Sequence, residues 1–143
     1  MKVHFFCSKD LYPKYGTHQK KIFMIYDRGD VVILPFPFIT TDGVQQKARP
    51  ALIVSDHSIE RRFNDVILAG ITSQRIDYIK QTEFIIEEGT DEFIRSGLAK
   101  TSVVRCEYLM TVPEEIIARK LGKLSGQDMH KIDKILKLSL GLR

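Results

Sequence analysis

Residues 47–74 read KARPALIVSDHSIERRFNDVILAGITSQ, and we expect the rest of the domain to be built around this segment. Two runs of mostly branched apolar residues flank a charged and polar segment, a pattern typical of two buried strands joined by a connection or a short helix. Each run has one polar residue of chemical interest at its border: Arg49 precedes the first and Thr72 ends the second. Pro50 favours an extended backbone at Arg49, so we expect the guanidinium at the entrance of a strand.

Further strands are expected on both sides of this stretch. Residues 31–34 predict a strand buried on both faces, and residues 81–86 and 101–112 predict two more. The last run is long for one strand, so we expect a bend or bulge within it. Two prolines directly after the first run lack backbone donors, which indicates a sheet edge or a departing segment. Residues 39–47 then read as a polar loop.

The C-terminal part of the chain changes period. Residues 114–118 predict a helical turn. Ser125 opens an SGQD sequence that resembles a capping box, and apolar residues follow at spacings of three and four, so residues 127–143 predict an amphipathic helix. Short strands in tandem with one closing helix predict a mainly β fold, a small barrel or strongly curved antiparallel sheet.

Composition limits the class of protein. The chain has 143 residues, 43% of them hydrophobic, which suits one globular domain with a core. The net charge of +4 is compatible with a polyanionic partner without requiring one. Cys7 and Cys106 lie far apart, which predicts neither a disulfide framework nor a cysteine metal site and fits a cytoplasmic protein. No apolar run approaches the roughly 20 residues that span a bilayer, so we expect no membrane partner.

Residues 1–23 differ from the rest, because they mix basic, aromatic and polar residues without a period. We interpret them as an N-terminal extension, disordered rather than a basic arm on nucleic acid, because termini are poorly ordered unless tied down. Met24 directly precedes the organised part, which raises the alternative that translation begins there. We expect residues 24–143 to form the domain.

Several segments occur in the order found in the MazF/PemK toxins, which the chain resembles from about residue 25 to residue 143. They are GDVVILPFPF (29–38), KARPALIVS (47–55), ITSQ (71–74), LAKTSVVRCE (98–107) and the final helix after KLGKLSG (120–126). The resemblance implies an SH3-like barrel that forms a homodimer and acts as the endoribonuclease toxin of a type II toxin–antitoxin pair. It further implies single-stranded mRNA as substrate, a cognate antitoxin as partner, and neither metal nor cofactor.

Cleaving RNA without a metal requires the ribose 2′-hydroxyl to attack the neighbouring phosphorus, which leaves 2′,3′-cyclic phosphate and 5′-hydroxyl ends. Charge grows on the phosphate oxygens, and an arginine can stabilise it with paired hydrogen bonds. Arg49 is the first candidate for this role and Thr72 is a second donor; both match positions that the family uses in catalysis. Arg105 and Glu107, two apart on one strand face, resemble the Arg–carboxylate pair of the PemK branch.

Two residues are candidates for the general base. The loop histidine of the PemK branch falls at Gly43 in this chain, so Glu107 is one candidate, if burial raises its pKa, and Asp42 is the other. We expect RNA contacts from residues near the catalytic candidates: Lys47, Ser73, Gln74, Ser102 and Asp42.

The same residues also have structural interpretations. Arg49 can pair with a surface carboxylate, Arg105 and Glu107 can form a salt bridge, and Ser102 can be an ordinary strand hydroxyl. Cys106 is expected to face the opposite side as a small core residue. The alternative function is a non-catalytic SH3-like barrel, either a binding module or a gyrase poison like the CcdB toxins.

Overall fold

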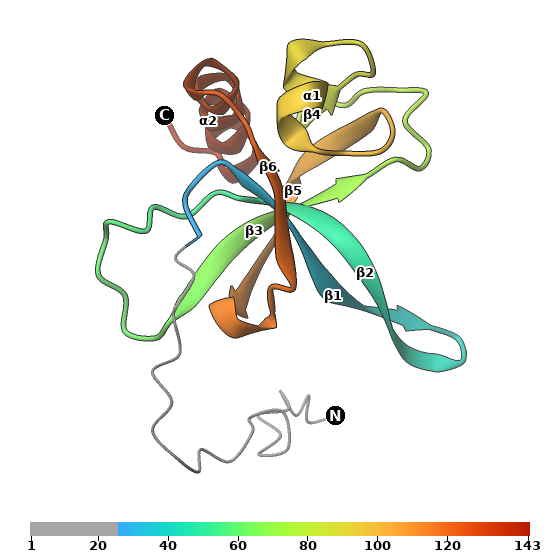
Figure 1. Cartoon of the computed structure of the whole chain (residues 1–143), viewed down its shortest axis with the longest axis vertical. Coiled ribbons are helices and arrows are strands. Elements are labelled where there is room, and N and C mark those ends of the chain that lie inside the picture. The colour runs from blue at the N-terminus through green and yellow to red at the C-terminus, as the bar shows by residue number, and fades with distance from the viewer. Residues whose placement is uncertain (1–25) are drawn as a thin grey trace.

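Six antiparallel strands form one sheet in the order β4-β5-β3-β2-β1-β6 in the computed structural model, which describes residues 26–143 (Figure 1). The strands are β1 (Asp30–Thr40), β2 (Gly43–Ile53), β3 (Asp65–Thr72), β4 (Glu83–Ile86), β5 (Ser102–Pro113) and β6 (Arg119–Lys123). The helices are α1 (Asp91–Ser96), α2 (Gly126–Leu140) and the 3-10 turn η1 (Glu114–Ile116). The extension expected at residues 1–23 and the alternative start at Met24 lie outside the described residues.

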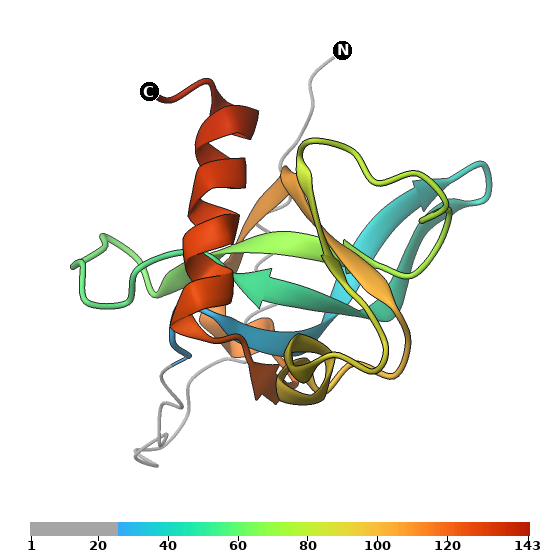
Figure 2. The ribbon, with the colours of Figure 1, turned by 90° about the horizontal axis from the view of Figure 1, so that it is seen from above.

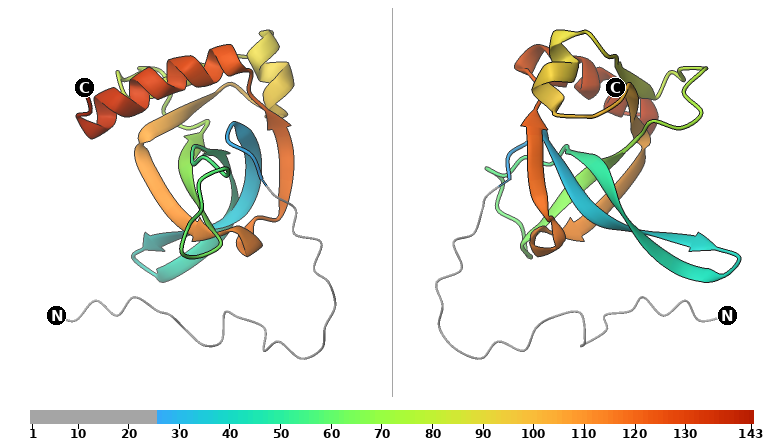
Figure 3. Two further views of the ribbon diagram at one scale, coloured as in Figure 1. Left: turned by 90° about the vertical axis from the view of Figure 1, so that its left-hand side faces the viewer. Right: turned by 45° about the vertical axis from the view of Figure 1, so that its right-hand side comes forward.

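The sheet is strongly curled, and α2 lies across one end of it (Figures 2 and 3). Among the described residues the outer strands β4 and β6 are not paired with each other, so the sheet does not close into a ring. The predicted mainly β fold of curved antiparallel strands with a C-terminal helix is confirmed, with the difference that the barrel is open. No helix within residues 26–143 is long and apolar enough to cross a membrane.

Neighbouring residues of the central strands point to opposite faces and enter two apolar clusters. Val31 of β1 and Leu52 of β2 belong to the cluster beneath α2, whereas Val32 and Ala51 belong to the cluster on the opposite face. Ile132 of α2 is fully buried in the first cluster. Burying a side chain of this size contributes about 1.5–3 kcal/mol, so the apolar stripe of α2 fixes the helix to the sheet.

Residues 39–47, predicted as a polar loop, instead belong to a β-hairpin that projects from the sheet (Figure 1). β1 and β2 stay paired as far as Thr40 and Gly43, which leaves a two-residue turn. Gly43 has a φ of +115°, a conformation that glycine adopts without steric cost. The loop prediction was wrong because the exposed side chains of residues 41–48 give no apolar alternation, while the backbone still satisfies its hydrogen bonds as a two-stranded ladder.

Pro35 and Pro37 lie in β1 beyond its pairing with β6, which covers residues 30–33. The Ile33 carbonyl accepts a hydrogen bond from the Ala118 N–H (2.8 Å), and backbone groups two residues apart point to the same side of a strand. The missing donors of the two prolines therefore face the open edge. The sheet edge predicted from these prolines is confirmed.

The sequence does not predict two short elements, α1 and β6. The Thr90 hydroxyl caps α1 by accepting from the Phe93 N–H (3.3 Å), and Gly97 ends the helix in the left-handed conformation. In β6 the backbone of Gly122 lies against the end of α1, where a β-carbon would be 2.1 Å from the Arg95 carbonyl oxygen. The glycine that interrupts the sequence pattern is what allows α1 to pack on β6.

Three other expectations are refined by the structure. The connection at residues 56–64 contains no helix, and the helical turn expected at 114–118 is the shorter η1. The last helix begins after Ser125, whose hydroxyl accepts from the Asp128 N–H (3.1 Å), as a capping residue does. It ends at Leu140.

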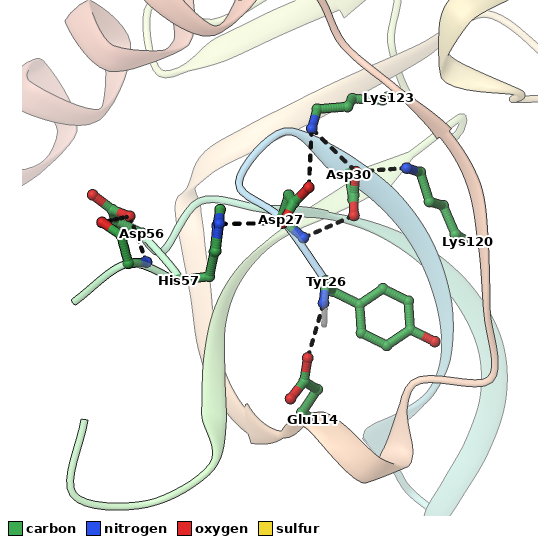
Figure 4. A network of polar contacts seen from close by, with 9 residues as sticks. Tyr26, Asp27, Asp30, Asp56, His57, Glu114, Lys120 and Lys123 are labelled. Carbon is green, nitrogen blue, oxygen red and sulfur yellow. Dashed lines mark hydrogen bonds and ion pairs between the residues drawn. The ribbon is translucent and has the colours of Figure 1, made fainter. Parts of the chain in front are cut away.

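A polar network fastens the start of β1 to β6 (Figure 4). Asp30 is 2% exposed, accepts a hydrogen bond from the Asp27 N–H (2.8 Å) and pairs with Lys120 (3.0 Å). Lys123 pairs with Asp27 (3.4 Å). A carboxylate this deeply buried requires such partners, so the network fixes the position of the outer strand β6.

Candidate functional site

Four neighbouring strands, β1, β2, β3 and β5, line one pocket of about 200 Å³. Its polar lining includes Arg49 of β2, Thr72 at the end of β3, Gln74 just beyond it, and Arg105 of β5. Tyr108 of β5 lines the same pocket. Three of the four residues proposed from the sequence as catalytic therefore lie together, although they are far apart along the chain.

Arg49 reaches the pocket because of the pairing between β2 and β3. The pairing ends at Ala51 and Gly70, and Arg49 and Thr72 each lie two residues beyond this last pair, on the same faces of their strands as Ala51 and Gly70. Ala51 and Gly70 share a face of the sheet, so Arg49 and Thr72 point to that face too, where both line the pocket. Within the described residues no carboxylate is paired with Arg49, so the surface ion pair considered for it is not observed there. Its guanidinium is available to an anionic ligand.

Thr72 presents a hydroxyl to the same pocket. Its oxygen accepts a hydrogen bond from the Gln74 N–H (3.1 Å), which shapes the turn after β3. A hydroxyl that accepts one hydrogen bond still has its own proton to donate. Thr72 can therefore donate to an oxygen of a ligand held by Arg49.

A bulge in β5 brings Arg105 and Tyr108 to the pocket. Gly70 is paired with Arg105, whereas the preceding residue of β3 is paired with Leu109, so residues 106–108 have no partner in β3. The bend or bulge predicted for this strand is confirmed. Because the unpaired residues interrupt the alternation of side chains along β5, Arg105 and Tyr108 can both lie at one pocket.

Glu107 does not line the pocket and is paired with Arg105 (3.0 Å), which is the salt-bridge interpretation. Its carboxylate also accepts a hydrogen bond from the Thr82 hydroxyl (2.8 Å). The Glu107 side chain is 40% exposed, and the hydrogen bonds from Thr82 and then Arg105 hold its pKa below the ordinary value. The condition set for Glu107 as general base, burial that raises its pKa, is therefore contradicted.

Three of the residues expected to contact RNA lie at or near the pocket. Gln74 lines it, and Ser73 is exposed between Gln74 and Thr72. Lys47 is exposed on β2, two residues before Arg49 and therefore on the same face of the strand. These three side chains can extend the contact surface on either side of Arg49 and Thr72.

Two other residues expected to contact RNA lie elsewhere. Asp42 is in the turn of the β1–β2 hairpin, about 20 Å along β2 from Arg49, too far to act as a base at the pocket of its own chain. Ser102 is 4% exposed and donates a hydrogen bond to the Lys100 carbonyl (2.9 Å). Because this hydroxyl is buried and satisfied, the expectation that Ser102 contacts RNA is contradicted.

Tyr108 is a polar residue of this pocket that the sequence analysis does not predict as part of the site. The run 101–112 reads as a strand in which every second side chain shares a face, and this period places Tyr108 opposite to Arg105 and Glu107. The bulge breaks that period. The available signal was an aromatic residue directly after the Arg-Cys-Glu sequence.

The pocket on the curled sheet combines two arginines with a hydroxyl group. This combination is suited to binding a phosphodiester or a similar anion, so the chain has the features of a small anion-binding protein. In the part of the chain that the structure describes, no group of three or more His, Cys, Asp or Glu side chains is placed to hold a metal ion. Residues 27–140 match the family described as PemK-like, MazF-like toxin of type II toxin-antitoxin system. The chain belongs to this toxin family.

Similar proteins cover most of the chain. It is 28% identical to Endoribonuclease EndoA of Bacillus subtilis (strain 168), over 83% of this chain and 97% of that protein. An endoribonuclease structure from Mycobacterial species is 26% identical, with a TM-score of 0.62 over 84% of this chain and 96% of that one. An endoribonuclease in complex with its cognate antitoxin, also from Mycobacterial species, shares the fold with a TM-score of 0.65 at 24% identity, over 83% of this chain and 98% of that one.

Proposed function

We propose that this chain is the RNA-cleaving toxin of a type II toxin–antitoxin pair, an endoribonuclease that acts on single-stranded mRNA in the cytoplasm. The observation that carries the proposal is the convergence of Arg49, Thr72 and Arg105 on one pocket. Membership of the toxin family and similarity to endoribonucleases from Bacillus subtilis and Mycobacterial species support the same activity.

The pocket suits cleavage of RNA by its own 2′-hydroxyl. In this reaction the 2′-oxygen forms a bond to the adjacent phosphorus, the bond from phosphorus to the 5′-oxygen breaks, and the products end in 2′,3′-cyclic phosphate and 5′-hydroxyl. Negative charge grows on the non-bridging oxygens during the attack. A preorganised donor aimed at such charge lowers the barrier by about 2.7–4 kcal/mol, and the pocket holds two guanidiniums and one hydroxyl.

The two arginines of the pocket differ in whether a carboxylate is paired with them. Arg49 has no carboxylate partner in the described part of the chain, so its full charge is available to the phosphate. Arg105 is held by Glu107 at 3.0 Å, and we assign Glu107 the role of positioning that guanidinium. Because the arginines supply charge at the phosphate, we expect cleavage without added metal.

We also propose a homodimer that is neutralised by a cognate antitoxin. The toxin family is defined by such pairs, and one mycobacterial endoribonuclease of the same fold is known in complex with its antitoxin. The pI of this chain is about 9.1, so an acidic antitoxin segment would complement it. Sedimentation of the purified chain tests the dimer, and co-expression with the protein encoded beside it tests whether growth is restored.

The main test incubates purified protein with mixed-sequence single-stranded RNA in the presence of a chelator. We expect fragments that end in 2′,3′-cyclic phosphate, and we expect Arg49→Ala to slow cleavage by about 10²–10³-fold. Arg62→Ala is the matched control, because Arg62 is exposed in the connection between β2 and β3 and does not line the pocket. Intact RNA across several sequences would contradict the proposal.

The alternative of a non-catalytic barrel, such as a gyrase poison, makes opposite predictions. RNA then stays intact at every protein concentration. Growth arrest by the expressed chain is then unaffected by Arg49→Ala, because the arginine has no transition state to stabilise.

A further inference from the structure

Tyr108 lies at the same pocket as Arg49 and Thr72, and the proposed chemistry leaves it without a role. It sits in the bulge of β5, outside the β3 pairing, and 40% of its surface is exposed. Partial exposure of a tyrosine is common in proteins, but this accessible ring lies at the same pocket as two phosphate-binding candidates, where bound RNA could reach it.

Three neighbours hold the Tyr108 ring in place. Its edge rests on Gly70, where a β-carbon would be 2.7 Å from ring atom Cδ1. The Phe36 ring centroid is 5.7 Å away at an interplanar angle of 30°, and the Arg105 guanidinium carbon is 5.2 Å from the centroid. Phe36 is buried, so the ring is anchored to the core on that side. A ring fixed in this way loses little conformational freedom when it binds a ligand.

RNA cleavage at this pocket requires a feature that the arginines do not supply. In-line attack by the 2′-hydroxyl needs the nucleotides on the two sides of the scissile phosphate to be unstacked from each other. Proteins that hold single-stranded RNA in an unstacked form place a base against an aromatic ring, because every base has a π-face. A base next to a phosphate bound by Arg49 and Arg105 would lie within reach of a ring at the same pocket.

We propose that Tyr108 is a base-stacking residue, which holds the nucleobase beside the scissile phosphate while Arg49 and Arg105 hold the phosphate. The inference rests on the proposed endoribonuclease function and adds a substrate contact to it. Because stacking does not depend on hydrogen bonds to a particular base edge, Tyr108 contributes affinity and alignment for any base.

The absence of tryptophan from the sequence allows a direct test of stacking. Tyr108→Trp creates a single tryptophan, whose fluorescence is quenched when a base stacks on it. The probe is mixed-sequence RNA with 2′-fluoro sugars, which lacks the attacking hydroxyl and stays intact. Tyr78→Trp is the matched control, because Tyr78 is 78% exposed in the connection between β3 and β4 and does not line the pocket. We expect saturable quenching for Tyr108→Trp and little for Tyr78→Trp.

A second measurement separates stacking from a merely structural role of Tyr108 in holding Arg105. By fluorescence anisotropy of the same labelled RNA, Tyr108→Ala should bind about 5- to 150-fold more weakly, and Tyr108→Phe should bind like the original chain. The salt dependence of affinity should be unchanged in Tyr108→Ala. In Arg105→Ala, which loses a phosphate contact, its slope should fall by about 0.7.

Each outcome of these measurements supports or overturns base stacking by Tyr108. Quenching with an unchanged salt slope supports stacking. Binding without quenching in Tyr108→Trp, or a reduced salt slope in Tyr108→Ala, overturns it and leaves the endoribonuclease proposal intact. If the original chain neither binds the 2′-fluoro RNA nor cleaves ordinary RNA, the proposed function and the stacking inference both fail.

Discussion

Gly70 of β3 and Tyr108 of β5 are in such close contact that a β-carbon at position 70 would lie 2.7 Å from Cδ1 of the tyrosine ring. Gly70 is also the residue paired with Arg105, directly where the β5 bulge begins. The absence of a side chain on β3 leaves the space into which the bulged strand folds. The position of Tyr108 at the pocket therefore depends on a glycine of the neighbouring strand.

Gly70→Ala should weaken RNA binding to about the same degree as Tyr108→Ala. The added methyl group displaces the ring, while Arg49 and Thr72 keep their places on their own strands. Anisotropy with 2′-fluoro RNA measures the effect. The double variant Gly70→Ala with Tyr108→Ala should be no weaker than Tyr108→Ala alone, because both changes remove one contact. Additive losses would show that Gly70 acts through something other than the ring.

The sequence predicts one half of the site better than the other. Arg49 and Thr72 stand at the borders of two apolar runs, and antiparallel pairing of consecutive strands is enough to bring such borders together, as the Ala51–Gly70 register shows. The β5 half depends on a register shift next to Gly70. A shift of this kind is set by packing between strands, so the strand period alone misplaces Tyr108.

The two strand segments that the sequence analysis did not predict have a similar explanation. The hairpin arm at residues 39–47 has no core to face, so its strands lack the alternation that identifies a half-buried strand. β6 is short and contains Gly122, and a glycine within a short segment is usually interpreted as the end of a strand or helix. The arm is held by the hydrogen bonds between its own two strands, whereas β6 is held by contacts with α1 and with the Asp30 network.

Glu107→Gln should leave the pH dependence of cleavage unchanged near neutral pH. The pKa of Glu107 is held below 4.5 by hydrogen bonds from Thr82 and Arg105, so this carboxylate is already ionised there. We expect a lower rate, because Arg105 loses the charge that positions it, with the same profile between pH 6 and 8. A neutral-range ionisation that disappears in Glu107→Gln would identify Glu107 as the base.

The same variant should also lose stability in a pH-dependent way. A carboxyl group whose pKa is lowered on folding contributes stability above its unfolded-state pKa and loses it as the pH falls. Because the pair is partly exposed, we expect a loss of about 0.2–1 kcal/mol near neutral pH and none once the pH is below the lowered pKa of the folded carboxyl group. Urea unfolding at the two pH values measures it, and an equal loss at both would contradict the ion-pair origin.

Cys106 should resist thiol reagents in the folded protein. It is fully buried in the cluster beneath α2, as predicted for a small core residue, and burial raises the pKa of its thiol to about 11 from 9.0. This shift alone lowers the thiolate fraction at pH 8 by about 100-fold. Labelling is measured in a Cys7→Ser background, with and without urea. Rapid labelling of the folded chain would show that the bulge opens.

Gly122→Ala should destabilise the fold by about 1–3 kcal/mol or more, measured by urea unfolding. The new methyl group would lie 2.1 Å from the Arg95 carbonyl oxygen and 2.6 Å from the Ser96 carbonyl carbon, and backbone atoms of a helix end cannot move aside without lifting α1 from β6. Gly126→Ala is the matched control, because no atom lies within 4 Å of its β-carbon and alanine favours the first turn of α2. Equal stability of the two variants would show that α1 is not held against β6. The residues that line the pocket come from neither α1 nor β6, so the residual folded Gly122→Ala protein should keep its RNA affinity while its unfolding midpoint falls.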